Sequence, residues 1–163
     1  MGQIRQLVVG TFVFGLLISA AAPARADITA FLGVNTTPST RQTRGIAAGV
    51  GLVIVGFEFE YAITNDDPSA GAPLLKTGMG SVYLQTPFAF HGVQPYFITG
   101  GGFYHEELGD HSDTSFGFNT GGGAKVALAG PLQLRFDYRI FRLGSGALNT
   151  SVHRFYAGVN LKL

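Results

Sequence analysis

The feature that most constrains the fold of this chain is a two-residue alternation of apolar and polar side chains. It is clearest in LQLRFDYRIF, residues 132–141, where large apolar side chains hold the even positions. Successive side chains of a β-strand point to opposite faces, whereas an amphipathic helix repeats every 3.6 residues. The stretch is therefore predicted to be a strand with one apolar face and one polar, charged face. The polar face carries Gln133, Arg135, Asp137 and Arg139.

The same alternation recurs along the chain and predicts about eight strands. These are residues 27–35, 45–53, 57–64, 76–86, 93–104, 115–128, 132–141 and 151–163. The 24 glycines are spread through these segments and disfavour long helices, since each interior glycine costs about 1 kcal/mol relative to alanine. An even number of strands lets the first pair with the last, which removes the sheet edges. We predict an all-β fold, a closed antiparallel transmembrane β-barrel of about eight strands.

The N-terminus has the pattern of an export signal. Arg5 precedes a short apolar run, and Ala24-Arg25-Ala26 resembles an A-x-A cleavage site. Residues 1–26 are therefore predicted to be a cleaved signal peptide, and residues 27–163 the barrel. The chain has no cysteine, so the exported domain uses no disulfides. Its net charge of +1, without a basic block, argues against a nucleic-acid partner.

The placement of charge indicates which face of the strands meets water. In several strands the charged residues lie opposite the large apolar ones, whereas a soluble ligand-holding barrel lines its interior with apolar groups. A lipid-embedded barrel reverses this arrangement. We therefore predict an interior charge network. It consists of Glu58, Glu60, Lys125, Arg135, Asp137 and Arg139.

The succession of segments resembles a known family. GVQPYFITGGGFY, FGFNTGGGAKVAL with GPLQLRFDYRIF, and the closing HRFYAGVNLKL are similar to the small outer-membrane barrels of Gram-negative bacteria, the OmpA/OmpX-like family. The resemblance implies residence in the cell outer membrane, contact with its lipid and lipopolysaccharide, and assembly by the outer-membrane machinery. The final strand of the family usually ends in Phe or Tyr, whereas this chain ends in Leu163.

The interior charges are expected to form two layers. Counted from the end with the shorter turns, the lower layer combines Glu58 and Glu60 with Lys125 and Arg135. Asp137 balances the higher positive charges, which are Arg139 and Arg154. At this barrel size side chains fill the lumen, so we expect no open pore.

Three groups of residues could carry chemistry, and for each we favour a structural interpretation. The predicted loop 105–114 combines His105, His111 and several carboxylates, a plausible metal-ligand set, but solvated loop charges are expected. The neighbouring Ser and His residues, His111-Ser112 and Ser151-Val152-His153, match no known catalytic pattern of the barrel enzymes. The glycine triplets at 100–102 and 121–123 lack the lysine and hydroxyl of a phosphate loop and are expected to permit curvature.

The resulting functional prediction is a monomeric outer-membrane barrel with a structural or surface-interaction role and loops directed outward. We expect no catalytic residue, no cofactor and no metal. Two alternatives stay open at this point, a lipid-modifying outer-membrane enzyme and a soluble lipocalin-like periplasmic carrier.

Overall fold

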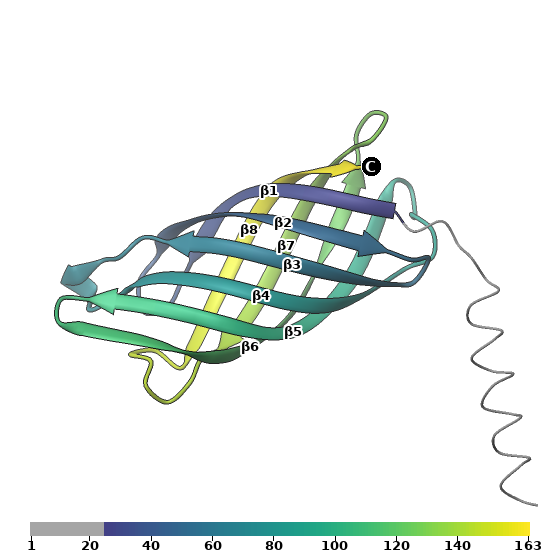
Figure 1. The fold of residues 1–163 in the computed structure, drawn as a ribbon. Coiled ribbons are helices and arrows are strands. Elements are labelled where there is room, and N and C mark those ends of the chain that lie inside the picture. The colour runs from purple at the N-terminus through teal and green to yellow at the C-terminus, as the bar shows by residue number, and fades with distance from the viewer. Residues whose placement is uncertain (1–24) are drawn as a thin grey trace, which may run out of the picture.

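Each alternating segment forms a strand, and the strands close into one barrel (Figure 1). The computed structural model describes residues 25–163. Every strand pairs antiparallel with its neighbours in sequence, and β1 pairs with β8, which confirms the predicted closed eight-stranded barrel. Residues 1–24 lie outside the described part, so cleavage after Ala26 stays a prediction. The strands are β1 (Arg25–Asn35), β2 (Arg41–Gly51), β3 (Val55–Thr64), β4 (Leu74–Gln85), β5 (Val93–Leu108), β6 (His111–Ala127), β7 (Leu132–Arg142) and β8 (Ser151–Lys162).

The two ends of the barrel carry different connections. At one end, here called the turn end, lie residues 52–54, 86–92 and 128–131, together with Arg25 and the C-terminus. The other, the loop end, carries 36–40, 65–73 with the short 3₁₀ helix η1 (Pro68–Ala70), 109–110 and 143–150. Connection length separates the two ends less cleanly than the sequence suggested, because 86–92 is longer than 36–40.

The predicted charged loop at 105–114 is wrong. β5 continues to Leu108 and β6 begins at His111, so this segment is the tip of the longest hairpin, closed by Gly109 and Asp110. Gly109 has φ 59°, a left-handed conformation that glycine adopts without steric cost. The charges misled the prediction because a strand that extends beyond the membrane can be polar on both faces and still pair along its backbone.

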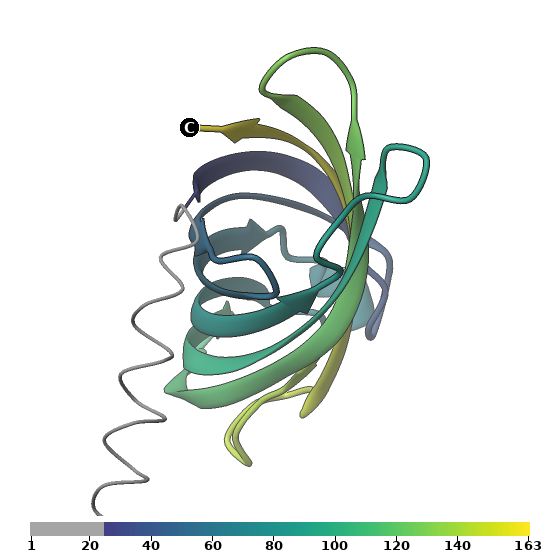
Figure 2. The ribbon, with the colours of Figure 1, turned by 90° about the vertical axis from the view of Figure 1, so that its right-hand side faces the viewer.

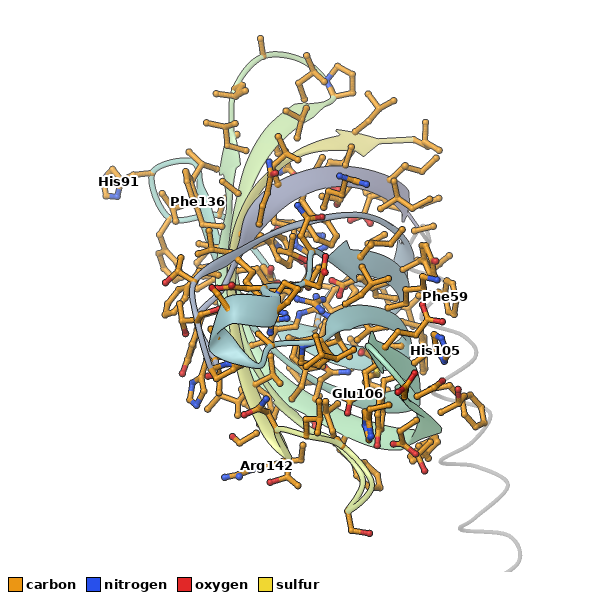
Figure 3. All side chains as sticks on the ribbon, turned by 90° about the vertical axis from the view of Figure 1, so that its left-hand side faces the viewer. Phe59, His91, His105, Glu106, Phe136 and Arg142 are labelled. Atoms are coloured by element: carbon orange, nitrogen blue, oxygen red, sulfur yellow. The ribbon has the colours of Figure 1, made fainter. Side chains whose placement is uncertain are left out.

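The outward face of the barrel is apolar and the inward face is charged. On β3, Phe57 and Phe59 are 59% and 60% exposed, whereas Glu58 and Glu60 are 4% and 0% exposed. Figure 3 looks from the loop end and shows Phe59 and Phe136 pointing away from the barrel. This arrangement is the reverse of a soluble carrier and suits a wall surrounded by lipid.

Closing the barrel staggers its strands by ten residues. The row of paired residues through Leu32 reaches Thr114 of β6 in one direction and Ala124 of β6 in the other. Residues that pair across strands therefore do not lie at one depth, and each row climbs toward the loop end from β1 to β6. Figure 2 shows the resulting coil of strands around the barrel axis from the turn end.

Inward glycines on β5 and β6 allow the wall to bend sharply. A Cβ on Gly100 would lie 2.2 Å from the carbonyl oxygen of Gly80, and one on Gly121 would lie 2.0 Å from that of Tyr138. These distances are too short for any side chain, so the neighbouring strand can approach only because glycine is present. The glycine triplets thus serve the curvature of the wall.

Candidate functional site

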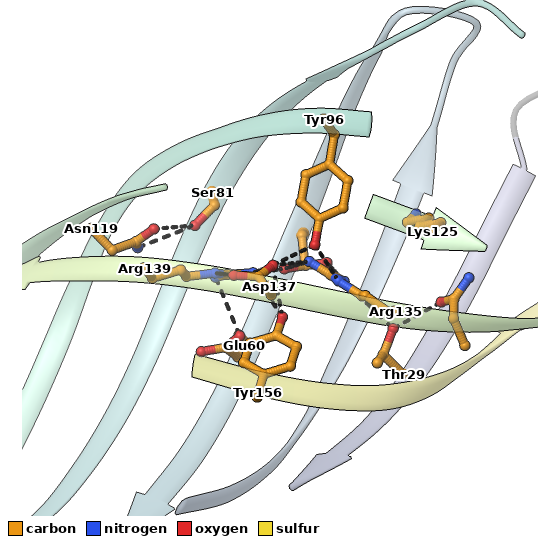
Figure 4. A network of polar contacts seen from close by, with 12 residues as sticks. Thr29, Glu60, Ser81, Tyr96, Asn119, Lys125, Arg135, Asp137, Arg139 and Tyr156 are labelled. Carbon is orange, nitrogen blue, oxygen red and sulfur yellow. Dashed lines mark hydrogen bonds and ion pairs between the residues drawn. The ribbon is translucent and has the colours of Figure 1, made fainter. Parts of the chain in front are cut away.

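The centre of the lumen holds a network of ion pairs that we call the central ion cluster (Figure 4). It contains three carboxylates and three guanidinium groups, so it is neutral in sum, and each member is at most 5% exposed. Its acids come from β3 and β7 and its arginines from β7 and β8. The members are Glu58, Glu60, Asp137, Arg135, Arg139 and Arg154.

Arg135 joins the two sides of the lumen. Its Nη1 and Nη2 both donate to the carboxylate of Glu58, the Nη2 bond to Oε1 measuring 3.1 Å. The same Nη2 donates to Oδ2 of Asp137 at 3.0 Å, and Nε donates to the hydroxyl of Tyr96 at 2.7 Å. A bidentate guanidinium–carboxylate pair fixes both partners in orientation as well as distance.

Arg139 and Arg154 extend the cluster toward the loop end. Arg139 donates to Glu58 Oε1 at 2.7 Å and to Asp137 Oδ1 at 2.9 Å, and its Nη1 lies 3.2 Å from Glu60 Oε2. Arg154 donates to Glu60 Oε1 at 2.9 Å and lies 4.3 Å from the centre of the Phe141 ring. Every arginine of the cluster therefore meets at least one carboxylate.

Two tyrosines complete the coordination of Asp137. The hydroxyls of Tyr96 and Tyr156 both donate to its Oδ2, the second at 3.1 Å, in addition to the arginine bonds. Buried charges are tolerated when hydrogen bonds satisfy their remaining lone pairs. The sequence prediction omitted both tyrosines, although the strand alternation already placed them on the inward face.

Lys125 requires a correction to the predicted layers. It does not join Glu58, Glu60 and Arg135, but pairs with Asp27 at 2.5 Å nearer the turn end. Glu60 belongs instead with Arg139 and Arg154. The prediction counted each residue from the end of its own strand, and the ten-residue stagger gives equal counts different depths. It also left Asp27 out of the interior acids.

The loop end of the lumen is filled by apolar side chains, here called the mouth plug. They come from β4, β5, β7, β8 and the 143–150 connection, and all are at most 9% exposed. The mouth plug covers the central ion cluster on this side. Its members are Leu75, Met79, Tyr104, Phe141, Leu143, Ala147 and Val152.

Buried charged side chains hold the connections over the mouth plug. Glu106, 1% exposed, accepts a 2.7 Å hydrogen bond from the backbone N–H of Leu148, and His111 Nε2 lies 2.9 Å from the same carboxylate oxygen. On the opposite side Arg41 donates to the carbonyl oxygens of Thr37, at 2.8 Å, and of Pro73. Three of the loop-end connections are thereby fixed to the barrel.

The turn end is open by comparison. A cavity of about 320 Å³ there is lined by twelve residues, among them Asp27, Tyr83, Gln94, Lys125 and Lys162. The Lys125–Asp27 pair lies in this cavity, and the central ion cluster lies beyond it along the barrel axis. A solute entering from the turn end would therefore meet paired charges before it reached the mouth plug.

The candidate metal ligands on the long hairpin lie on opposite faces of the sheet. His105 and Glu107 face outward, 3.4 Å apart, while Glu106, His111 and Asp113 face inward. Figure 3 labels His105 and Glu106 on this hairpin. Within residues 25–163, no group of three His, Cys, Asp or Glu side chains is arranged to hold a metal ion.

The candidate catalytic neighbours Ser151 and His153 both face outward on β8. The Nδ1 of His153 lies 2.7 Å from the hydroxyl of Tyr138, and Ser151 is paired across the sheet with Arg142. The structure thus places His153 in a hydrogen bond with a tyrosine on the lipid-facing side of the barrel.

Comparison with known proteins gives one matching family and several solved structures with the same fold. The family model described as outer membrane protein beta-barrel domain matches residues 12–162. No curated protein matches the chain. Neisserial surface protein A is 18% identical, with a TM-score of 0.69 over 86% of this chain and 97% of that one. The N-terminal barrel of Pseudomonas aeruginosa OprF is 15% identical, with a TM-score of 0.64 over 85% and 97%.

An enzyme shares this architecture as well. The outer membrane enzyme PagL is 13% identical, with a TM-score of 0.55 over 83% of this chain and 98% of that one. At such identities the likeness concerns the fold alone, and proteins of different function share one fold. The fold alone therefore does not decide the function.

Proposed function

This chain belongs to the outer membrane protein β-barrel family and resides in the outer membrane of a Gram-negative bacterium, and from this premise we propose a non-conducting barrel with a surface-interaction role. The barrel anchors the chain in lipid, and the loop end faces the outside of the cell. The interaction surface consists of the long β5–β6 hairpin and the connections fixed around the mouth plug.

The observation that carries this proposal is the filling of the lumen by two different blocks in series. The central ion cluster joins β3 to β7 and β8 across the lumen, and the mouth plug covers it. Opening a path would require breaking buried ion pairs, which can cost about 3 to 5 kcal/mol for each lost partner. Solute passage is therefore not the function that these side chains support.

The loop end supports a role in recognition. The connection 143–150 is held by Glu106, and Arg41 holds the connections on the other side. Fixed connections lose less conformational entropy when a partner binds, which favours affinity. A catalytic role finds less support, because the polar side chains of the interior are mostly engaged with one another.

Site-directed labelling tests the orientation, because the chain has no cysteine of its own. Single cysteines at Ser69 and at Ala129 are matched exposed positions at opposite ends of the barrel. A membrane-impermeant maleimide applied to intact cells should label the cysteine at position 69 and not the one at 129. Labelling at 129 alone would reverse the orientation and contradict the proposal.

Conductance measurements test the sealed lumen. The purified protein inserted in planar bilayers should give no discrete current steps above the baseline of the lipid. Regular steps from a folded sample, identified by its distinct mobility on an unheated gel, would show a pore and overturn the non-conducting barrel.

A further inference from the structure

Charge on the outward face of the barrel is confined to one half. The turn-end half carries no Asp, Glu, Lys or Arg on an outward-facing strand position between residues 25 and 163. The loop-end half carries three cations and one acid, and the acid, Glu107, is 3.4 Å from His105. The three cations are Arg44, Lys76 and Arg142.

Arg44 is the unusual member because it lies within the apolar belt. It is paired across the sheet with Leu32 on one side and with Ile63 on the other, and it is followed on its own face by Ile46. Leu32 and Ile46 are 60% and 61% exposed, as lipid-facing side chains are. A charged side chain among such neighbours is costly in a bilayer.

Lys76 lies on the same row, two strands away. Ile63 is paired with both Arg44 and Lys76, so the two cations flank one isoleucine. Because the row climbs toward the loop end, Lys76 lies about 6 Å higher along the barrel axis than Arg44, for strands that rise 3.3 Å per residue at a tilt near 40°. A long arginine side chain at the lower position can reach upward with its charged end, toward the lysine and the membrane surface.

Neither cation has a side-chain partner within residues 25–163. Among the residues that the structure describes, no hydrogen bond or ion pair involves the side chain of Arg44 or Lys76, whereas the acids of the strands are mostly turned inward. Intramembrane charges ordinarily pair with each other or mark a functional site. The countercharge for these two must therefore come from outside the barrel wall.

We propose that Arg44 and Lys76 form a phosphate-binding site for the lipopolysaccharide of the outer leaflet. This inference rests on the proposed orientation, with the loop end outside. Guanidinium binds phosphate through two parallel hydrogen bonds and ammonium binds it as a point charge, so the pair suits one phosphate group above Ile63. The lipid of the other leaflet would meet no outward cation, which favours an outer-leaflet glycolipid over a phospholipid.

The experiment compares wild type with R44Q/K76Q in nanodiscs of phosphatidylcholine. Binding of bisphosphorylated lipid A is titrated by native mass spectrometry. Each cation near a membrane surface contributes about a five-fold change in affinity, so the double variant should bind roughly 25-fold more weakly. K162Q removes a cation at the turn end and should bind like wild type. Dephosphorylated lipid A should bind wild type no better than it binds the double variant.

A second readout detects the site through the sign of a stability change. In phosphatidylcholine alone, R44Q should unfold at a higher urea concentration than wild type, because the uncompensated charge is gone from the lipid face. With lipid A present, R44Q should unfold at a lower concentration than wild type. R44K, which keeps the charge, should retain most of the binding.

Three results would overturn the proposal. The first is equal binding of lipid A by wild type and by R44Q/K76Q. The second and third are binding of dephosphorylated lipid A, or of phosphatidylglycerol, to wild type that is as strong as its binding of lipid A. The last would replace the glycolipid with any anionic lipid. Nanodisc binding depends neither on the orientation in cells nor on conductance, so these failures are distinguishable from failure of the proposed function.

Discussion

The central ion cluster and the mouth plug close the same tube by opposite means. The cluster consists of charged groups with almost no exposure, each held by several partners, whereas the plug consists of apolar side chains of ordinary core type. Apolar packing tolerates volume-conserving exchange, because any side chain of similar size fills the space. A buried ion network tolerates no loss of a partner, because the remaining charge is left unpaired.

The difference shows how a narrow barrel resolves a conflict in its lumen. Near the middle of the membrane the outward face must be apolar. In a strand of alternating apolar and polar residues, the polar residues then point inward. At the loop end the strands leave the lipid, and residues such as Leu75 and Phe141 can face inward without restricting the outside. The two blocks therefore should respond differently to mutation.

The largest effect is expected for Arg135→Ala. It removes one of the two guanidinium partners of Glu58 and of Asp137 and should lower the free energy of unfolding by about 3 to 5 kcal/mol. Urea titration of the barrel in detergent or lipid measures this change. Arg142→Ala is the matched control, since Arg142 lies outward and takes part in no ion pair within residues 25–163, and should stay within about 0.5 kcal/mol. Equal losses of unfolding free energy in Arg135→Ala and Arg142→Ala would show that an arginine of the ion cluster matters no more than an unpaired arginine on the outside.

Truncation of a side chain in the mouth plug should cause the second-largest loss in the free energy of unfolding. Leu75, 1% exposed, lies within the plug, and Leu75→Ala should cost about 2 to 5 kcal/mol through lost contacts and a new cavity. Leu75→Met keeps the volume and should cost less than about 1.5 kcal/mol in the same urea titration. A methionine variant as unstable as the alanine variant would show that the site depends on specific shape, as the ion cluster does.

A double-mutant cycle sharpens the comparison within the cluster. Glu58 and Arg135 share two hydrogen bonds, so removing both should show a coupling energy of about 0.5 to 3 kcal/mol. No hydrogen bond or ion pair joins Glu60 to Arg135, and their coupling should be smaller. Equal coupling in the two cycles would mean that the lumen charges interact through a common hydrated volume and not through defined pairs.

The smallest effect is expected from salt. Raising NaCl to about 1 M shortens the screening length to about 3 Å, but buried pairs are screened much less than exposed ones. The unfolding free energy of the wild type should therefore change by less than about 0.5 kcal/mol. A barrel closed by the apolar plug alone should show the same small change. A marked loss in salt would indicate water among the charges of the cluster.

The fold follows from the sequence to a large extent. Alternation of apolar and polar residues in segments such as 57–64 and 132–141 identifies strands without any knowledge of their partner strands. The even or odd position of Glu58 and of Arg135 within its segment is enough to assign each to the charged face. The hairpin tip at 105–114 escapes this reasoning, because its polar composition resembles that of a loop. Backbone pairing between β5 and β6 decides its structure, and pairing leaves little trace in composition.

The contacts of the site follow from the sequence only in part. Membership of the inward face is local information, but the choice of partner depends on register across several strands. Lys125 illustrates this, since its partner Asp27 lies in the first strand and becomes a neighbour only through the stagger. The alternation of the strands places Tyr96 and Tyr156 on the inward face, but the sequence does not indicate which carboxylate their hydroxyl groups will contact.

The charges of the central ion cluster and of the Lys125–Asp27 pair are divided unequally between the two halves of the chain. The first four strands contribute acids alone, Asp27, Glu58 and Glu60, whereas the last four contribute four cations and one acid. Within these ion pairs, the first four strands contribute a charge of −3 and the last four a charge of +3. Their attraction favours closure during assembly, and neither half can enter lipid as an open sheet without unpaired charge. Insertion and closure should therefore be a single event, in which these charges neutralise one another only when the last strand meets the first.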